Sequence, residues 1–192
     1  MSIDDQMVRG VNYIFTRQYI LQHQGMDLWK KVLAMLPLEH RQEWEKPLLA
    51  ISLYSFSAYM ELIEKYCDMI SVAQKQELIS IYEYIAEQSL TTLYKHYMNR
   101  TDPSSMIGNF PKMWDRFFSA GKVEVYELTP TSVRLEFELP EVFLSWIFSA
   151  CLGFSRKAVE LGGGVGLVQQ EKKRIRVKAD IWKISYSLNW GK

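Results

Sequence analysis

The sequence has few of the residues that most often build metal and redox sites. It contains three histidines, His23, His40 and His96, and two cysteines, Cys67 and Cys151. No histidine has partners at the spacing of a zinc signature, so we expect no metal. Both cysteines fall in apolar helical patterns, which indicates reduced thiols in a cytoplasmic protein rather than a disulfide framework.

The sequence also lacks a strong charge imbalance and a long apolar run. Its formal net charge is +1, which gives no electrostatic argument for nucleic acid or an anionic membrane. No unbroken apolar run reaches the roughly 18 residues of a membrane span. The first residues are acidic where a secretory signal would be basic. We therefore expect no nucleic-acid partner, no membrane span and no secretory signal.

Apolar residues are plentiful, and their periodicity changes at Gly121. Before it, helical spacing predicts helices near 8–25, 27–36, 55–70 and 74–97, with two short helical segments after Asp102. After it, the pattern predicts strands at 122–129 and 132–139, a helix from Pro140 to Leu161, and strands near 165–171 and 179–190. The predicted fold class is α+β. A helical lobe (residues 1–121) packs on a ββαββ lobe (residues 122–192), whose four strands form an antiparallel sheet with one long helix, and the two fold as one unit.

Four glycines in residues 162–166 follow the predicted helix and precede a strand. A dinucleotide-binding loop has the opposite order, because phosphate binds at a helix N-terminus. A P-loop would also need a Lys-Ser or Lys-Thr pair after the glycines. The pattern therefore predicts a helix C-cap and a turn.

Two aromatic segments, "MWDRFF" and "FLSWIF", fall where the helical lobe should meet the sheet. Solid core packing explains them, and an apolar ligand pocket is the alternative, because pockets favour such junctions. The candidate pocket residues are Trp114, Phe117, Phe118, Phe143, Trp146, Phe148 and Cys151.

A basic run follows the glycines and is expected in a hairpin between the last two strands. It is either a solvated turn or a contact for an acidic partner surface. The candidate partner-binding residues are Lys172, Lys173, Arg174, Arg176 and Lys178.

Catalytic motifs are not visible in the sequence. No Gly-x-Ser-x-Gly elbow occurs, and Glu136 and Glu138 alternate outward on their predicted strand. The sequence gives no positive argument for an enzyme.

Several segments resemble a family of uncharacterised proteins with many paralogues in myxobacteria. They are "YSFSAYMELIE", "FPKMWDRFFSAGKVEVYELTPTSVRLEF", "WIFSACLGFSRKAVELGGG" and "WKISYSLNW". The most specific stretch supplies Trp114, Arg116, Phe117, Phe118 and Gly121. The helix–glycine–two-strand ending also resembles the small-molecule-binding domain named after four-vinyl reductase. The whole order of elements is remotely similar to the heme–nitric oxide sensor domain.

These resemblances imply a bacterial cytoplasmic sensor or adaptor rather than a catalyst. The heme sensor family carries its axial histidine on the helix before the sheet, but that helix here reads "PKMWDRFF". The tyrosine–serine–arginine motif for the heme propionates has no counterpart, and the last hairpin lacks the cysteines of the reductase-type domain. No cofactor is therefore expected, and a heme gas sensor that uses His96 is the disfavoured alternative.

The function predicted from the sequence is a non-enzymatic sensory or adaptor domain. It would bind an apolar small molecule or a signalling protein between the two lobes, with the helix at 141–161 as the moving element. The alternative is a protein-interaction or homodimerisation module that has no ligand.

Overall fold

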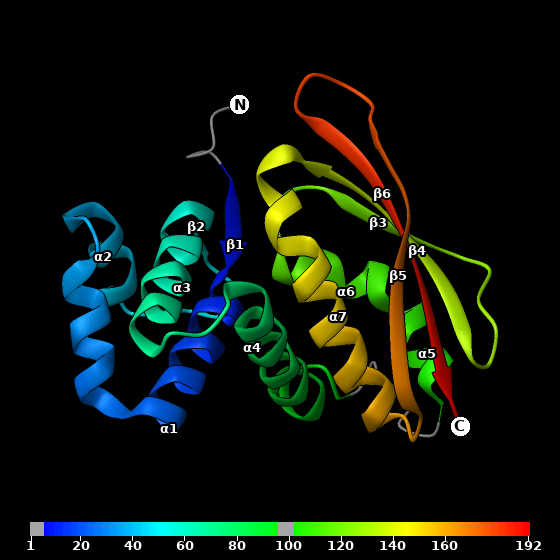
Figure 1. Cartoon of the computed structure of the whole chain (residues 1–192), viewed down its shortest axis with the longest axis horizontal. Coiled ribbons are helices and arrows are strands. Elements are labelled where there is room, and N and C mark those ends of the chain that lie inside the picture. The colour runs from blue at the N-terminus through cyan, green and yellow to red at the C-terminus, as the bar shows by residue number, and fades with distance from the viewer. Residues whose placement is uncertain (1–5, 96–101) are drawn as a thin grey trace.

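Helices build the N-terminal part of the chain, and the computed structural model describes residues 6–95 and 102–192 (Figure 1). Apolar residues at helical spacing bury one face of α3 and several sides of α4. Ser55 caps α3 by accepting a hydrogen bond from the Ala58 amide. The elements of this part are β1 (Met7–Arg9), α1 (Gly10–Met35), α2 (Leu38–Glu45), β2 (Leu53–Ser55), α3 (Phe56–Ile70), α4 (Gln74–Gln88) and the π-helical turn η2 (Ser89–Leu93).

The structure corrects three details of the predicted helical part. Gly25 has φ of 79°, so the two helices expected at 8–25 and 27–36 form one element with a kink. The helix expected at 74–97 is α4 followed by η2, and its last residues, with His96, lie outside the described part. The two short strands β1 and β2 pair with each other and were not predicted.

Strands then form a four-stranded antiparallel sheet in the order β3-β4-β6-β5, which confirms the α+β class. On β4 the side chains of Val133, Leu135, Phe137 and Leu139 face the core, whereas alternate charged residues face outward. The outward Glu136 pairs with Lys183 at 2.8 Å. The elements are α5 (Pro103–Gly108), α6 (Phe110–Phe117), β3 (Lys122–Tyr126), β4 (Ser132–Pro140), the 3₁₀ turn η4 (Glu141–Phe143), α7 (Leu144–Leu161), β5 (Val165–Arg176) and β6 (Ile181–Gly191).

The helix expected to start at Pro140 begins later, because Pro140 still pairs with Ile181 as the last residue of β4. At its other end α7 stops at Leu161, and Gly163 adopts φ of 86°, as a helix C-terminal turn requires. The glycine run is therefore the predicted cap and turn.

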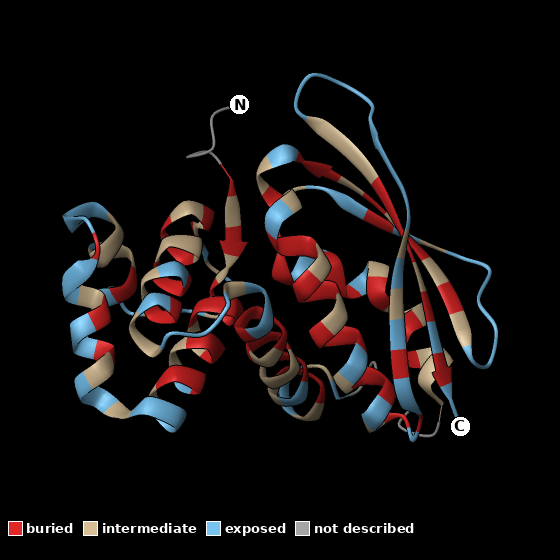
Figure 2. Cartoon of the chain, viewed as in Figure 1, coloured by how far each residue is buried: buried red, intermediate tan, exposed pale blue. Residues whose placement is uncertain are grey.

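Helix α7 lies between α4 on one side and the sheet on the other (Figure 1). With the preceding turn, Glu141–Leu161 is the one described segment that is long and apolar enough to span a membrane. Most of this segment is buried within the protein, as Figure 2 shows, so it serves as a core helix.

Helices α5 and α6 also pack against α7 and the sheet, although they precede Gly121. Buried side chains from both parts of the chain form a single continuous core. The division at residue 121 stays a prediction.

Candidate functional site

Helix α7 approaches the backbone of α4 closely at Gly153. A Cβ atom on Gly153 would lie 2.3 Å from the Ile79 carbonyl oxygen, so only glycine fits there. Ser149 is buried one turn earlier on α7. These small residues let the two helices approach closely and fix the position of α7 relative to the helical lobe.

Trp146, in the first turn of α7, is the centre of an aromatic cluster at the junction where α7 meets α3, α4 and α6. It is 1% exposed. Its ring centroid lies 4.8 Å from Phe118, 5.5 Å from Tyr82 and 5.7 Å from Phe56, all in edge-to-face arrangements. The cluster therefore joins α3, α4 and the end of α6 to α7.

Helix α6 supplies the wall of the junction nearest the sheet. The Trp114 ring lies 4.4 Å from Phe118 and 5.5 Å from Phe137 of β4, and its indole N–H donates to the Ala120 carbonyl at 3.1 Å. Phe117 packs edge-to-face on Phe154 of α7 at 5.5 Å. These contacts hold α6 between α7 and the sheet.

A cavity of about 20 Å³ lies between these rings. A single water needs roughly 10–15 Å³ and two to four polar partners. The cavity has room for one small molecule of that size, but its walls are rings, methyl groups and sulfur atoms, so we expect it to be dry. The lining residues are Tyr82, Phe110, Met113, Trp114, Phe117, Phe118, Trp146, Ile147, Ala150, Cys151 and Phe154.

A buried polar network lies beside the cavity and points away from it. The Tyr82 hydroxyl donates to Asn12 Oδ1 at 3.2 Å, and the Asn12 amide donates to the Phe117 carbonyl at 2.9 Å. Tyr59 and Thr16 share a hydrogen bond of 2.9 Å in the same region. Asn12 thus links α1 and α4 to the C-terminal end of α6.

Burial keeps the titratable groups of the junction neutral. It raises the pKa of the Cys151 thiol to about 12, against a small opposing effect of Ser155. It also raises the pKa of Tyr59 to about 12 and that of Tyr82 well above its usual range. These groups therefore offer no charged side chain to a ligand at neutral pH.

The structure brings most of the predicted pocket residues together. Five of the seven line the cavity: Trp114, Phe117, Phe118, Trp146 and Cys151. Phe143 lies just behind the cavity wall, with its ring 4.4 Å from Phe56 and 5.6 Å from Trp146.

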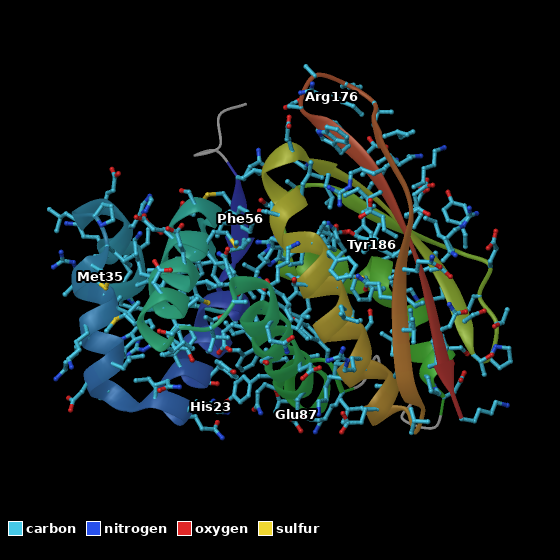
Figure 3. The ribbon with its side chains drawn as sticks, in the orientation of Figure 1. His23, Met35, Phe56, Glu87, Arg176 and Tyr186 are labelled. Atoms are coloured by element: carbon cyan, nitrogen blue, oxygen red, sulfur yellow. The ribbon has the colours of Figure 1, made fainter. Side chains whose placement is uncertain are left out.

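Phe148 does not join this group, because it lies on the sheet side of α7. Its ring packs on Tyr186 at 5.8 Å. Figure 3 shows Tyr186 on the sheet and Phe56 on the helical lobe, on opposite sides of α7. Whether any of these residues binds a ligand stays a prediction.

Six lining residues were not predicted from the sequence: Tyr82, Phe110, Met113, Ile147, Ala150 and Phe154. Phe154 and Ile147 occur in the α7 pattern at helical spacing, so they could have been found by following one face of that helix. Tyr82 could not, because α4 is apolar on several sides.

The basic run lies on β5 rather than in a hairpin loop, because β5 continues to Arg176. Arg174 pairs with Glu171 at 2.6 Å, and Arg176 pairs with Glu141 at 3.0 Å. Of the five predicted partner-binding residues, only Lys178 lies in the turn before β6.

An open groove lies between α3 and the start of α7. His40 contacts Glu61 at its rim, and Met60, Val142 and Leu144 are part of its walls. Its size exceeds that of the junction cavity, but its charged groups already have partners: Glu61 contacts His40, Glu64 contacts Lys65, and Glu141 contacts Arg176.

No protein-family model and no curated protein sequence match the chain. Solved structures do match it. A Fe(II) unliganded H-NOX protein from K. algicida has a TM-score of 0.71 at 15% identity, over 96% of this chain and 97% of that one. An oxygen-binding H-NOX domain related to soluble guanylate cyclases has a TM-score of 0.70 at 8% identity, over 95% and 93%. The chain therefore has the H-NOX fold, in which heme–nitric oxide sensor domains occur.

Heme is the group that this fold suggests, but the described junction residues do not fit it. The cavity is water-sized, whereas a heme needs a flat space of far greater volume. The described histidines, His23 and His40, lie on α1 and α2 and do not line the cavity. The lining includes no arginine or lysine for propionates, and Cys151 is held as a thiol.

Proposed function

We propose that this chain is a non-enzymatic sensory or adaptor domain that uses the H-NOX fold without heme. Its input would be an apolar small molecule or a signalling partner bound at the junction of the two lobes. The observation that carries this proposal is the small, almost wholly apolar cavity that rings from α4, α6 and α7 line.

The cavity is so small that a ligand could bind only together with a conformational change. A ligand larger than a water molecule enters only if rings such as Trp146 and Phe118 move apart. Those rings belong to α7 and to the end of α6, so the ligand selects a state in which the two lobes are displaced. A displacement of α7 is the output of such a sensor.

The proposal is tested first with the freshly purified 192-residue chain. An absorption spectrum and native mass spectrometry of one sample report heme and any co-purified ligand, respectively. We expect no Soret band, and added mass if an apolar ligand is retained. A Soret band with stoichiometric heme would overturn the heme-free proposal.

Thermal unfolding with a series of small apolar ligands then tests the junction directly. A ligand bound only by the native state raises the melting temperature. Ala150→Leu fills the cavity and should abolish this shift, whereas Phe148→Leu alters the opposite side of α7 and should preserve it. No stabilisation by any ligand, together with the bare chain mass, would reject the small-molecule version and leave the adaptor version.

A further inference from the structure

Strand β5 is an edge strand of the sheet. The order β3-β4-β6-β5 gives it one neighbour, β6, and no other described strand pairs with it. Its outer edge therefore presents backbone N–H and C=O groups that a further strand could bind. In Figure 1 this strand lies at the front of the sheet, and Figure 2 shows residues 172–180 as exposed.

Exposed apolar side chains accompany this free edge. Val168 is 62% exposed and Ile175 is 38% exposed. Ile175 pairs in register with Lys183, whose ammonium bonds to Glu136 on the outward face, so Ile175 shares that face. A strand added here would cover these two side chains.

The charges along the edge are unbalanced. Arg174 and Arg176 are neutralised by Glu171 and Glu141, and Lys172 donates to an uncharged amide of Gln170. In the described part of the chain, Lys173 and Lys178 have no ion-pair partner. Lys178 lies beyond the strand, in a turn that also contains Asp180, so β5 itself keeps the unpaired positive charges of Lys172 and Lys173.

This charge discriminates between the two kinds of strand that could bind. A second copy of β5 would bring the same unpaired lysines to the shared edge, and like charges close to each other destabilise a strand pair. The register shift at Lys172 bends the edge and further weakens pairing of two identical strands. An acidic strand gains attraction from the same lysines.

We propose that the free edge of β5 binds an extended acidic segment of a partner protein as an added strand. Its backbone would pair with β5, its carboxylates would lie beside Lys172 and Lys173, and β-branched residues would cover Val168 and Ile175. This surface does not include the junction cavity, so it stands or falls independently of the proposed ligand.

The probe is a short, capped, fluorescently labelled peptide with Glu and Val in turn on one strand face and Thr at the positions between them, because Lys173 and Ile175 share a face of β5. It is titrated into the chain and followed by anisotropy. Binding should weaken about tenfold or more for Lys172→Glu combined with Lys173→Glu. The matched control is Lys30→Glu combined with Lys31→Glu, which reverses two adjacent exposed lysines on α1 and should leave affinity unchanged. A peptide with Lys in place of each Glu should not bind.

A second peptide tests the backbone pairing. N-methylation of the peptide amides that face β5 removes the hydrogen bonds of an added strand but keeps every carboxylate. We expect it to abolish binding. Equal binding of the methylated peptide, equal weakening by the α1 control, or no binding of the acidic peptide at low salt would each overturn the proposal. A dimer that the β5 double variant dissociates would assign the edge to a second copy instead.

Discussion

Replacement of Trp146 by alanine should destabilise the protein and create a cavity that has the shape of the missing indole ring. Trp146 is 1% exposed and packs on four rings from three helices, namely Phe56 of α3, Tyr82 of α4, and Trp114 and Phe118 of α6 and its C-terminal end. Truncation of such a side chain costs about 3–5 kcal/mol of unfolding free energy. For a chain of this size each kcal/mol lowers the melting temperature by about 2–4 °C, so the total loss is about 6–20 °C.

The new cavity would merge with the existing void and stay dry, so it should bind indole. Indole at about one hundred times its dissociation constant would restore about 2.7 kcal/mol. The control is Trp182→Ala, because Trp182 is only partly buried and does not line the cavity. Calorimetry measures the melting temperature of both variants with and without indole. If the alanine variant does not fold, Trp146→Phe takes its place in the same measurement. A loss below about 1 kcal/mol, or equal stabilisation of both variants by indole, would refute the assignment of Trp146 to the centre of the core.

Three other results follow from the same junction. Gly153→Ala should lower the free energy of unfolding by about 1–3 kcal/mol, because the added Cβ would meet the Ile79 carbonyl oxygen. Urea unfolding measures this change, and an unchanged urea midpoint would show that α7 does not approach α4 so closely. Asn12→Leu should cost about 1–3 kcal/mol, because the buried Tyr82 hydroxyl loses its acceptor, and pairing it with Tyr82→Phe should cost less than the sum of the two. Cys151, whose pKa is raised to about 12, should resist thiol reagents in the folded protein. Because the folded pKa lies above the unfolded value of about 8.5, its contribution to stability is complete below that value and is lost as pH rises toward 12; rapid native labelling would contradict this.

The sequence predicts the fold well where one strong pattern governs an element. The α7 helix shows two apolar faces in its residues alone, and the structure places α4 and the sheet on them. The sequence does not predict the short strands β1 and β2, because each has only three residues, which are too few to show alternation. The sequence predicts β5 only to residue 171, because the charged residues that follow are typical of a solvated turn. The strand continues to Arg176.

The candidate site was less predictable because it depends on distances between elements. Trp146 and Phe148 are only two positions apart in the sequence. On a helix, side chains two positions apart point about 200° away from each other. The structure accordingly places them on opposite sides of α7. Tyr82 reaches the cavity from a helix that is apolar on several sides, so no pattern selects it. The volume of the cavity is set by packing of several elements and leaves no trace in the sequence.

The junction and the free edge of β5 are joined by two contacts, one on α7 and one on the turn η4 before it. The Gln169 side-chain amide of β5 donates to the Phe148 carbonyl at 2.9 Å, and Arg176 of β5 pairs with Glu141, directly before α7. If a ligand displaced α7 as proposed, it would strain both contacts and change the position of the strand that would bind an acidic partner. Because coupling between two binding sites is reciprocal, a peptide on β5 must change the affinity of the junction ligand by the same factor. Titration of indole into Trp146→Ala with and without the acidic peptide measures that factor, and a value of one would show that the two surfaces act separately.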